Sequence, residues 1–342
     1  MADGPVRGAD GGPGDASSFP RRHARTRGFT LGRPRGFQAG ADGARVAFLR
    51  SAAGDDPVNR LWVLELASGA ERLVADPARL LGGDPGDVPP EERARRERAR
   101  ERAGGVVAFA ADLDLTVASF ALAGRLFVAA LDGPGGVREL PAGEAVLDPR
   151  VDPTGARVAW VADRALHVAP LGDAGAGRRL AGGDDPEVSW GLAEFVAAEE
   201  MGRTRGFWWA PDGERLAVAR VDLAKVRRFH LADPTNPAIE PVRLPYPAAG
   251  TANAEVSLHV VDLEGRRVEV SWDRAAYPYL ASVLWEAGGP LTLLVQSRDQ
   301  AATLVLAADP APGRPPPWPP SATRPGSTSS AACRRGWTAG WS

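Results

Sequence analysis

Residues 210–220, APDGERLAVAR, join a polar turn to a short strand whose apolar residues alternate. The same arrangement occurs at 41–50 (ADGARVAFLR) and at 152–162 (DPTGARVAWVA). In each copy Asp and Gly supply the turn, and the period of two that follows indicates a strand with one buried face. The repeated phrase predicts several small antiparallel units of similar construction.

A second short strand follows the first in these units. Four segments fit this position: NRLWVLEL (59–66), GRLFVAAL (124–131), RALHVAPL (164–171) and VSLHVVDL (256–263). Units of short strands that recur every ~40–60 residues are typical of a β-propeller. We therefore predict an all-β fold over residues 36–310, a partial β-propeller of about four to five blades. A β-sandwich has a similar strand rhythm, but it would not repeat the turn-and-strand phrase.

The composition limits the classes of partner and compartment. The formal net charge of −2 gives no basis for a nucleic-acid or membrane-surface partner. Cys333 is the one cysteine, which excludes a disulfide framework and argues against a thiol-ligated metal. The sequence shows neither a signal peptide nor an apolar run long enough to span a bilayer. We expect a cytoplasmic protein without a metal or other cofactor.

The two ends of the chain depart from the strand pattern. Residues 1–35 begin with a Gly-, Arg- and Asp-rich stretch, and we expect a disordered tail there. Residues 311–342 are rich in Pro, Ser and Arg and break off inside an unfinished blade. We expect this second tail to be disordered or to result from a frameshift near residue 312.

Two internal segments also interrupt the strands. Residues 89–103, PPEERARRERARERA, have charges at helical spacing but no apolar face, so this helix should be solvated or lie over a cavity. Residues 191–202, GLAEFVAAEEMG, predict a short helix with Gly202 as its C-cap. This second helix carries two adjacent carboxylates, Glu199 and Glu200.

Adjacent residues on an ideal helix point about 100° apart, so two neighbouring carboxylates converge on one ligand only where a helix ends or distorts. Like charges held close together raise each other's pKa unless a cation lies between them. A primary ammonium group, with its three N–H donors, suits such a pair. The alternative is a solvated acidic face with Arg203 or Arg205 as the ion-pair partner.

Three segments together resemble the dipeptidyl peptidase IV family of serine peptidases. They are AEFVAAEEMGRTRGFWWAPDGERLAVARVD (193–222), RLPYPAAGTANAEVSLHVVDLEG (243–265) and EERARRERARERAGGVVAF (91–109). In that family a Glu-Glu pair lies on a short helical excursion from the propeller, ahead of a Trp-Trp strand. The third segment looks like the Arg-rich segment of the intracellular and bacterial members. The resemblance implies a multi-bladed propeller that caps an α/β-hydrolase domain.

The resemblance also implies roles for particular residues. Glu199 and Glu200 would bind the free α-amino group of a peptide, which restricts the intact enzyme to releasing N-terminal X-Pro or X-Ala dipeptides. Arg100, or alternatively Arg98, would hold a carbonyl oxygen of the substrate. Intact members are often homodimeric, so the implied partners are a peptide N-terminus and a second copy.

The catalytic α/β-hydrolase domain of the family is expected to be absent from these 342 residues. No Gly-x-Ser-x-Gly sequence occurs, and the nucleophile of that domain stands in such a motif. We assign no catalytic residue and expect this chain alone to lack peptidase activity.

The four histidines, His23, His167, His230 and His259, have neither metal-ligand spacing nor a partner serine, and we expect structural roles for them. Two other functions stay open. One is a stand-alone propeller that serves as a protein-interaction platform, and the other is a peptide-binding decoy that keeps the Glu pair.

Overall fold

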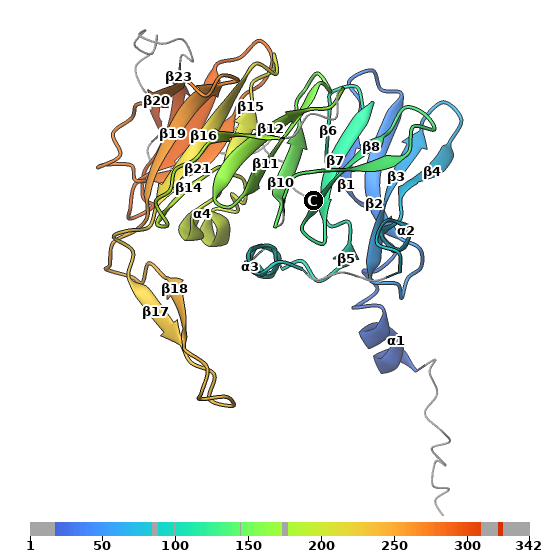
Figure 1. The fold of residues 1–342 in the computed structure, drawn as a ribbon, viewed down its shortest axis with the longest axis horizontal. Coiled ribbons are helices and arrows are strands. Elements are labelled where there is room, and N and C mark those ends of the chain that lie inside the picture. The colour runs from blue at the N-terminus through green and yellow to red at the C-terminus, as the bar shows by residue number, and fades with distance from the viewer. Residues whose placement is uncertain are drawn as a thin grey trace, which may run out of the picture.

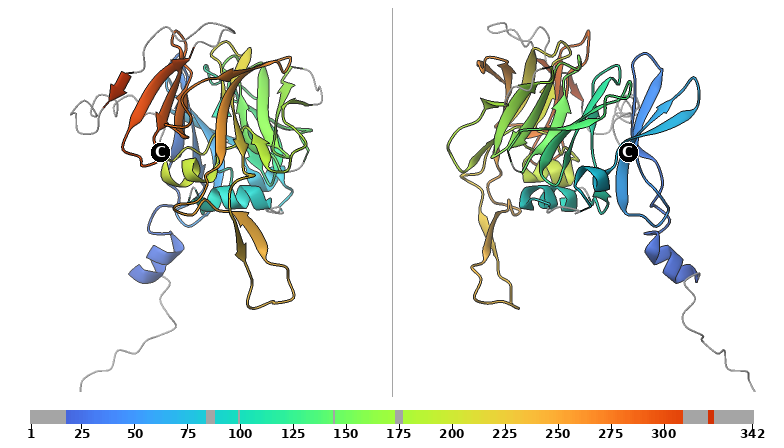
Figure 2. Two further views of the ribbon diagram at one scale, coloured as in Figure 1. Left: turned by 90° about the vertical axis from the view of Figure 1, so that its left-hand side faces the viewer. Right: turned by 45° about the vertical axis from the view of Figure 1, so that its right-hand side comes forward.

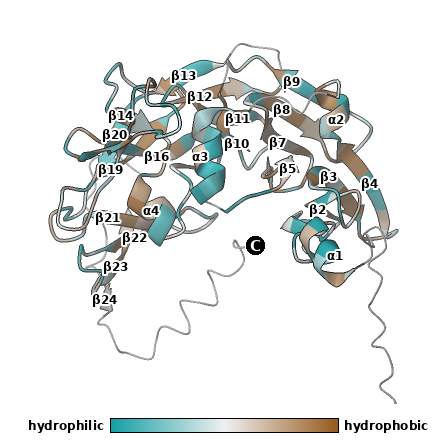
Figure 3. Ribbon diagram, turned by 90° about the horizontal axis from the view of Figure 1, so that it is seen from below, coloured by the Kyte–Doolittle hydropathy of each residue, from teal (hydrophilic) through white to brown (hydrophobic). Residues whose placement is uncertain are grey.

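The computed structural model describes residues 18–83, 88–98, 100–143, 145–172, 177–308 and 321–323. These residues form five successive antiparallel sheets of four or five strands, placed side by side like the blades of an incomplete propeller (Figure 1). Seen from below, the sheets follow an open arc (Figure 3). The partial β-propeller predicted from the repeated phrase is therefore confirmed.

Each of the first three sheets uses four consecutive strands in chain order, and the first gains a short parallel strand at β3. The strands of the first sheet are β1 (Arg35–Ala39), β2 (Arg45–Ser51), β3 (Val58–Glu65), β4 (Ala70–Ala75) and β5 (Gly104–Gly105). Those of the second are β6 (Ala110–Ala111), β7 (Val117–Leu122), β8 (Arg125–Ala130) and β9 (Val137–Leu140). Those of the third are β10 (Leu147–Val151), β11 (Arg157–Ala162), β12 (Ala165–Pro170) and β13 (Arg178–Ala181).

The last two sheets carry the additions that matter for function. The fourth comprises β14 (Val188–Trp190), β15 (Phe207–Trp209), β16 (Arg215–Asp222), β19 (Glu255–Asp262) and β20 (Arg267–Val270). The fifth comprises β21 (Tyr279–Leu284), β22 (Leu291–Gln296), β23 (Thr303–Ala308) and β24 (Ser321–Thr323). A separate hairpin, the arm, consists of β17 (Arg228–Leu231) and β18 (Val242–Pro245) and projects from one rim of the arc (Figure 2).

Hydrophobic cores fill the spaces between neighbouring sheets. Four clusters of buried residues combine side chains of the first and second, second and third, third and fourth, and fourth and fifth sheets. Phe120, Trp160 and Phe207 are among the largest fully buried side chains. Because each apolar strand face is covered by the next sheet, the arc is stabilised by a series of interfaces rather than by one central core.

The Asp and Gly of the repeated phrase have a structural explanation. Asp152 is fully buried, and its Oδ1 accepts hydrogen bonds from Thr154 N (2.9 Å) and Ala156 N (3.1 Å). Gly155 in the same turn has a φ of +74°, which favours glycine. Such an Asx turn fixes the reversal between two strands of one blade, which is why the phrase recurs.

A helix interrupts the innermost strand of the fourth sheet. Strands β14 and β15 both pair with β16, β14 opposite residues 220–222 and β15 opposite residues 216–218. The chain leaves this line after β14, forms α4 (Phe195–Glu200) and returns at β15. The short helical insertion predicted to carry the Glu pair is thus an excursion from a strand.

Two other helices lie near the same rim as α4 (Figure 1). Helix α3 (Pro90–Arg98) falls within the Arg-rich segment, and α2 (Pro77–Leu80) follows β4. The Arg-rich helix is solvated on one side, where Arg93, Glu97 and Arg98 are exposed, and lies over a cavity on the other. Glu92 of α3 is buried and lines this small cavity.

The two predicted tails are not uniformly unstructured. Residues 18–35 contain helix α1 (Phe19–Arg25), and the rings of Phe19, His23 and Phe29 contact one another there. In the second tail β24 pairs with β23, which the Pro-rich composition did not predict. Ring contacts among apolar side chains explain the helix in the first tail, and pairing with β23 explains the strand in the second. The rest of the two tails, with Cys333 and most of the proposed frameshift, lies outside the described residues.

Among the helices in the described part of the chain, none combines the length and apolarity that crossing a bilayer requires.

Substitution of Gly206 by Ala should destabilise the fourth sheet severely. A Cβ at Gly206 would lie 2.3 Å from Gly191 C and from Leu192 N, which are backbone atoms that cannot move aside. We expect a loss of about 3 kcal/mol or more in the free energy of unfolding. Urea denaturation measures it, with Gly133→Ala as the control because its Cβ meets no atom within 4 Å. Equal midpoints for the two variants would contradict this packing.

Candidate functional site

The site is built on the α4 excursion, whose two ends meet closely. Gly191 N donates to Ala219 O (2.9 Å) and Ala219 N donates to Gly206 O (2.8 Å), so both ends bond to the same residue of β16. Only glycine allows the chain to approach itself as closely as it does between Gly191 and Gly206. The excursion therefore begins and ends at one fixed point of the fourth sheet.

A buried ion pair holds α4 in place. Glu194 is the N-cap of the helix, and its carboxylate accepts from Ala197 N at 3.0 Å. Arg203 Nη2 lies 3.6 Å from Glu194 Oε1, and both side chains are 4% exposed. Arg203 Nε also donates to Leu280 O of β21 (2.8 Å). One arginine thus connects the start of α4, the segment after it and the fifth sheet.

Burial lowers the pKa of Arg203, and the charge of Glu194 opposes that change. The possibility that Arg203 neutralises the Glu pair is therefore wrong, because its ion-pair partner is Glu194. Arg205, the other arginine considered for that role, is instead under the influence of Asp148 and Arg150 on β10.

The Glu pair occupies the last turn of α4, where the helix ends at the C-cap Met201 and Gly202 follows with a φ of +66°. Both Glu199 and Glu200 are exposed. In the view from below, α3 and α4 lie on the inner side of the arc of sheets (Figure 3). The pair is therefore carried by a helix on the inner side of the arc.

Arg98, and not Arg100, is the arginine that reaches this pair. Arg98 Nε lies 3.6 Å from Glu199 Oε1, and its guanidinium lies 5.5 Å from the centre of the Phe195 ring. Arg100 occupies the turn after α3 with a φ of +52°, and its backbone N–H donates to Glu97 O. The Arg100 side chain forms no ion pair or hydrogen bond with the part of the chain that the structure describes. Within the described residues Glu200 has no ion-pair or hydrogen-bond partner.

The base of α3 is charged and buried. Burial by itself would lower the pKa of Arg95, but its hydrogen bonds to Glu92 raise it above the ordinary value. This buried network was not predicted. One sequence feature could have indicated it. Glu92 precedes Arg95 by three residues and Arg96 by four, and side chains at these spacings meet on a helix.

Contrary to the expectation that no histidine has a partner serine, His259 lies next to one. His259 Nε2 lies 3.0 Å from Ser257 Oγ, a residue two positions earlier on the same face of β19. Burial lowers the pKa of His259. Both residues line a cavity of about 720 Å³ at the fourth sheet. In the described part of the chain, no group of three or more His, Cys, Asp or Glu side chains is placed to hold a metal ion.

Comparison with known proteins gives a consistent result. A family model described as the dipeptidyl peptidase IV (DPP IV) N-terminal region matches residues 122–328, more than half of the chain. The chain is similar to human dipeptidyl peptidase 8 (31% identical over 104 residues), to the inactive dipeptidyl peptidase 10 of Rattus norvegicus (36% over 91) and to the venom dipeptidyl peptidase 4 of Apis mellifera (34% over 94).

These alignments cover 25–27% of this chain and 11–12% of the length of the relatives. The structure is also similar to that of a dipeptidyl peptidase 4 of Porphyromonas gingivalis, with a TM-score of 0.62 and 20% sequence identity. That match covers 84% of this chain and 40% of the other, and at this identity it bears on the fold alone.

Substitution of Glu194 by Gln should destabilise the protein although the side chain keeps its size. Glutamine can still accept from Ala197 N, but it leaves the buried Arg203 without a counter-ion. We expect a loss of about 3–5 kcal/mol in the free energy of unfolding, measured by urea denaturation. Glu200→Gln is the matched control on the same excursion and should change stability by less than about 0.5 kcal/mol. Similar losses for both would show that the ion pair does not anchor α4.

Proposed function

Because the chain belongs to the family of the dipeptidyl peptidase IV N-terminal region, we propose that Glu199 and Glu200 bind the free α-amino group of a peptide. The intact enzyme is then a serine-type dipeptidyl peptidase that releases N-terminal X-Pro or X-Ala dipeptides. In this proposal the described residues gate the substrate and hold its amino end. The alternative of a stand-alone interaction platform requires no function for the Glu pair.

One observation carries the proposal: the pair stands exposed at the end of a helix that is rigidly anchored on the inner side of the arc. An exposed carboxylate pair is available to a ligand, whereas a pair already neutralised by buried arginines would not be. The three N–H donors of a primary ammonium group can bond to both carboxylates at once, and such charge-assisted bonds are the strong ones.

Arg98 has a role in the same proposal. It forms the ion pair with Glu199 at 3.6 Å while its ring contact with Phe195 keeps it close to α4. An incoming ammonium group competes for Glu199, and Arg98 is then free to donate to a carbonyl oxygen of the same peptide. Binding at the amino end and at a nearby carbonyl sets the distance to the scissile bond, which explains a preference for dipeptide release.

Exposed apolar residues of the arm support the other partner that the resemblance implied, which is a second copy of the chain. Six large apolar side chains on and next to β17 and β18 are 45–57% exposed: Phe229, Leu231, Ile239, Val242, Leu244 and Tyr246. Monomeric proteins rarely leave such side chains in one contiguous group. We propose that two arms pack against each other in a homodimer.

A calorimetric titration tests the amine-binding role. An X-Pro dipeptide with a free amino group should bind at least tenfold more tightly than its N-acetylated form, because acetylation removes the positive charge; tenfold is about 1.4 kcal/mol. Glu199→Gln and Glu200→Gln should each abolish this difference. Glu214→Gln, on the exposed turn before β16, is the control and should preserve it. Equal affinities of the wild-type chain for the two peptides would dismiss the proposal.

Sedimentation velocity tests the arm. The wild-type chain should be a dimer at micromolar concentration, and the double variant Phe229→Ser, Ile239→Ser should be a monomer, since both side chains are more than half exposed and their loss removes mainly intermolecular burial. Val268→Ser, which changes an exposed residue of β20, should leave the dimer intact. A monomeric wild-type chain, or a double variant that still dimerises, would exclude the arm as the interface.

A further inference from the structure

A line of aromatic rings connects the arm to α4. Tyr246 follows β18 directly, and the centre of its ring lies 5.2 Å from that of Phe195, the first residue of α4, at an interplanar angle of 72°. The Tyr246 ring also lies 6.3 Å from the ring of Phe229 on β17. Edge-to-face contacts at such distances stabilise aromatic pairs. The arm therefore contacts the helix that carries the Glu pair.

Phe195 also contacts the arginine that pairs with Glu199. The guanidinium of Arg98 lies 5.5 Å from the centre of the Phe195 ring, and Arg98 Nε lies 3.6 Å from Glu199 Oε1. One ring is thus shared by Tyr246 of the arm and by Arg98 of α3. A rotation of the Phe195 side chain would remove the support of Arg98 at the point where it meets the Glu pair.

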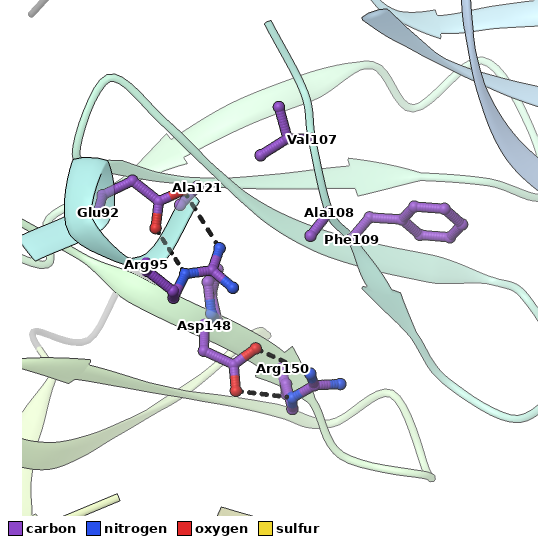
Figure 4. A pocket seen from close by; sticks show the side chains of 9 residues that line it. Glu92, Arg95, Val107, Ala108, Phe109, Ala121, Asp148 and Arg150 are labelled. Atoms are coloured by element: carbon purple, nitrogen blue, oxygen red, sulfur yellow. Dashed lines mark hydrogen bonds and ion pairs between the residues drawn. The ribbon is translucent and has the colours of Figure 1, made fainter. Parts of the chain in front are cut away.

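Both helices are held firmly at their starts. In α3, buried Glu92 accepts from Arg95 Nε at 2.7 Å, and Figure 4 shows these two side chains facing Asp148 of β10. In α4 the buried ion pair of the N-cap residue has the same effect. The last turns of the two helices, which carry Arg98 and the Glu pair, depend more on side-chain contacts such as those of Phe195.

Tyr246 belongs at the same time to the proposed dimer surface, since it is 45% exposed and Phe229 is 57% exposed. The arm projects away from the sheets (Figure 2), and Tyr246 N donates to Arg227 O at 2.9 Å at its base. A second copy packed on the arm would cover Tyr246 and Phe229 and restrict the motion of their rings. That restriction would extend to Phe195 through the ring contact.

We propose that Tyr246 is a positioning residue for the amine site and couples dimerisation through the arm to peptide binding at Glu199 and Glu200. In the dimer Tyr246 holds Phe195, and Phe195 keeps Arg98 and the last turn of α4 in the arrangement that receives a peptide. In a monomer these rings move, and a peptide binds more weakly because it must order them. This inference rests on the proposed amine-binding role and on the proposed dimer.

Calorimetric titration with an X-Pro dipeptide measures the coupling. The double variant Leu231→Ser, Leu244→Ser removes exposed apolar side chains of the arm but leaves the three rings, so it should be monomeric. It should bind the dipeptide about fivefold more weakly than the wild-type dimer, which is the lower end of the usual range for coupled sites. Tyr246→Leu should remain a dimer and show the same fivefold loss, and combining it with the double variant should add no further loss.

Two further variants separate positioning from a general structural effect. Tyr246→Phe keeps the ring and should bind the dipeptide as the wild type does. Tyr277→Leu, in the segment before β21, is the matched control and should also retain wild-type affinity.

Sedimentation velocity measures the same coupling in the other direction. Coupling between two binding equilibria is reciprocal, so saturating dipeptide should lower the dimer dissociation constant of the wild type about 25-fold, fivefold for each of the two sites. Tyr246→Leu should show no such change.

Hydrogen exchange distinguishes a failure of this inference from a failure of the amine-binding role. The amides of Ala198 and Arg203, which donate to Glu194 O and Ala197 O, report on α4. Without peptide they should exchange at least fivefold more slowly in the wild-type dimer than in Tyr246→Leu or the monomeric double variant. If they do, but the dipeptide binds equally well after N-acetylation, the amine-binding role is wrong and the positioning of α4 by Tyr246 stands.

Three results would overturn the coupling. The first is equal exchange and equal dipeptide affinity in the wild type and Tyr246→Leu. The second is a Tyr246→Phe variant that behaves like Tyr246→Leu. The third is a wild-type chain that is monomeric, or a wild-type dimer that binds the dipeptide no better than the monomeric double variant.

Discussion

The buried ion pair between Glu194 and Arg203 determines where α4 lies, and α4 carries both acidic residues of the proposed site. A helix of six residues has little stability of its own. Its position depends on the capping carboxylate at one end, on the arginine that follows it and on the carbonyl of Leu280 that this arginine reaches. Because that carbonyl belongs to the next blade, the orientation of the Glu pair depends on how two sheets pack, and not on the helix alone.

The arc of sheets supplies the rigid frame for this arrangement. Each of the first four blades contains a turn in which an aspartate accepts backbone hydrogen bonds, and the turns of these neighbouring blades contact one another. Leu113 N donates to Pro153 O at 3.2 Å, and a Cβ at Gly213 would lie 3.3 Å from Asp152. The cores between sheets and these contacts between turns act together, so a short excursion from one strand can be held without a core of its own.

Charge is distributed unevenly along the inner rim. Glu199 and Glu200 are exposed at the end of α4, whereas Arg95 and Arg96 of α3 and Arg150 of β10 are mostly buried and are paired with the carboxylates of Glu92 and Asp148. Exposed carboxylates are solvated by water and are stable without a counter-ion. Buried guanidinium groups have lost their water and need an ion-pair or hydrogen-bond partner inside the protein. The difference in solvation therefore leaves Glu199 and Glu200 available to a ligand, while the buried arginines depend on carboxylates of the protein itself.

The sequence by itself determined the fold class, the excursion and the Glu pair. Alternation with period two and the Asp-Gly turns are local properties, and local hydrogen bonds such as those of Asp152 fix them within a few residues. The tertiary structure alone decided which arginine serves which carboxylate. Arg98 rather than Arg100 faces Glu199, and Arg203, which also reaches Leu280 of the next blade, belongs to Glu194. Ion pairs between segments about 100 residues apart depend on how helices and sheets pack in space, and no spacing along the chain encodes that distance.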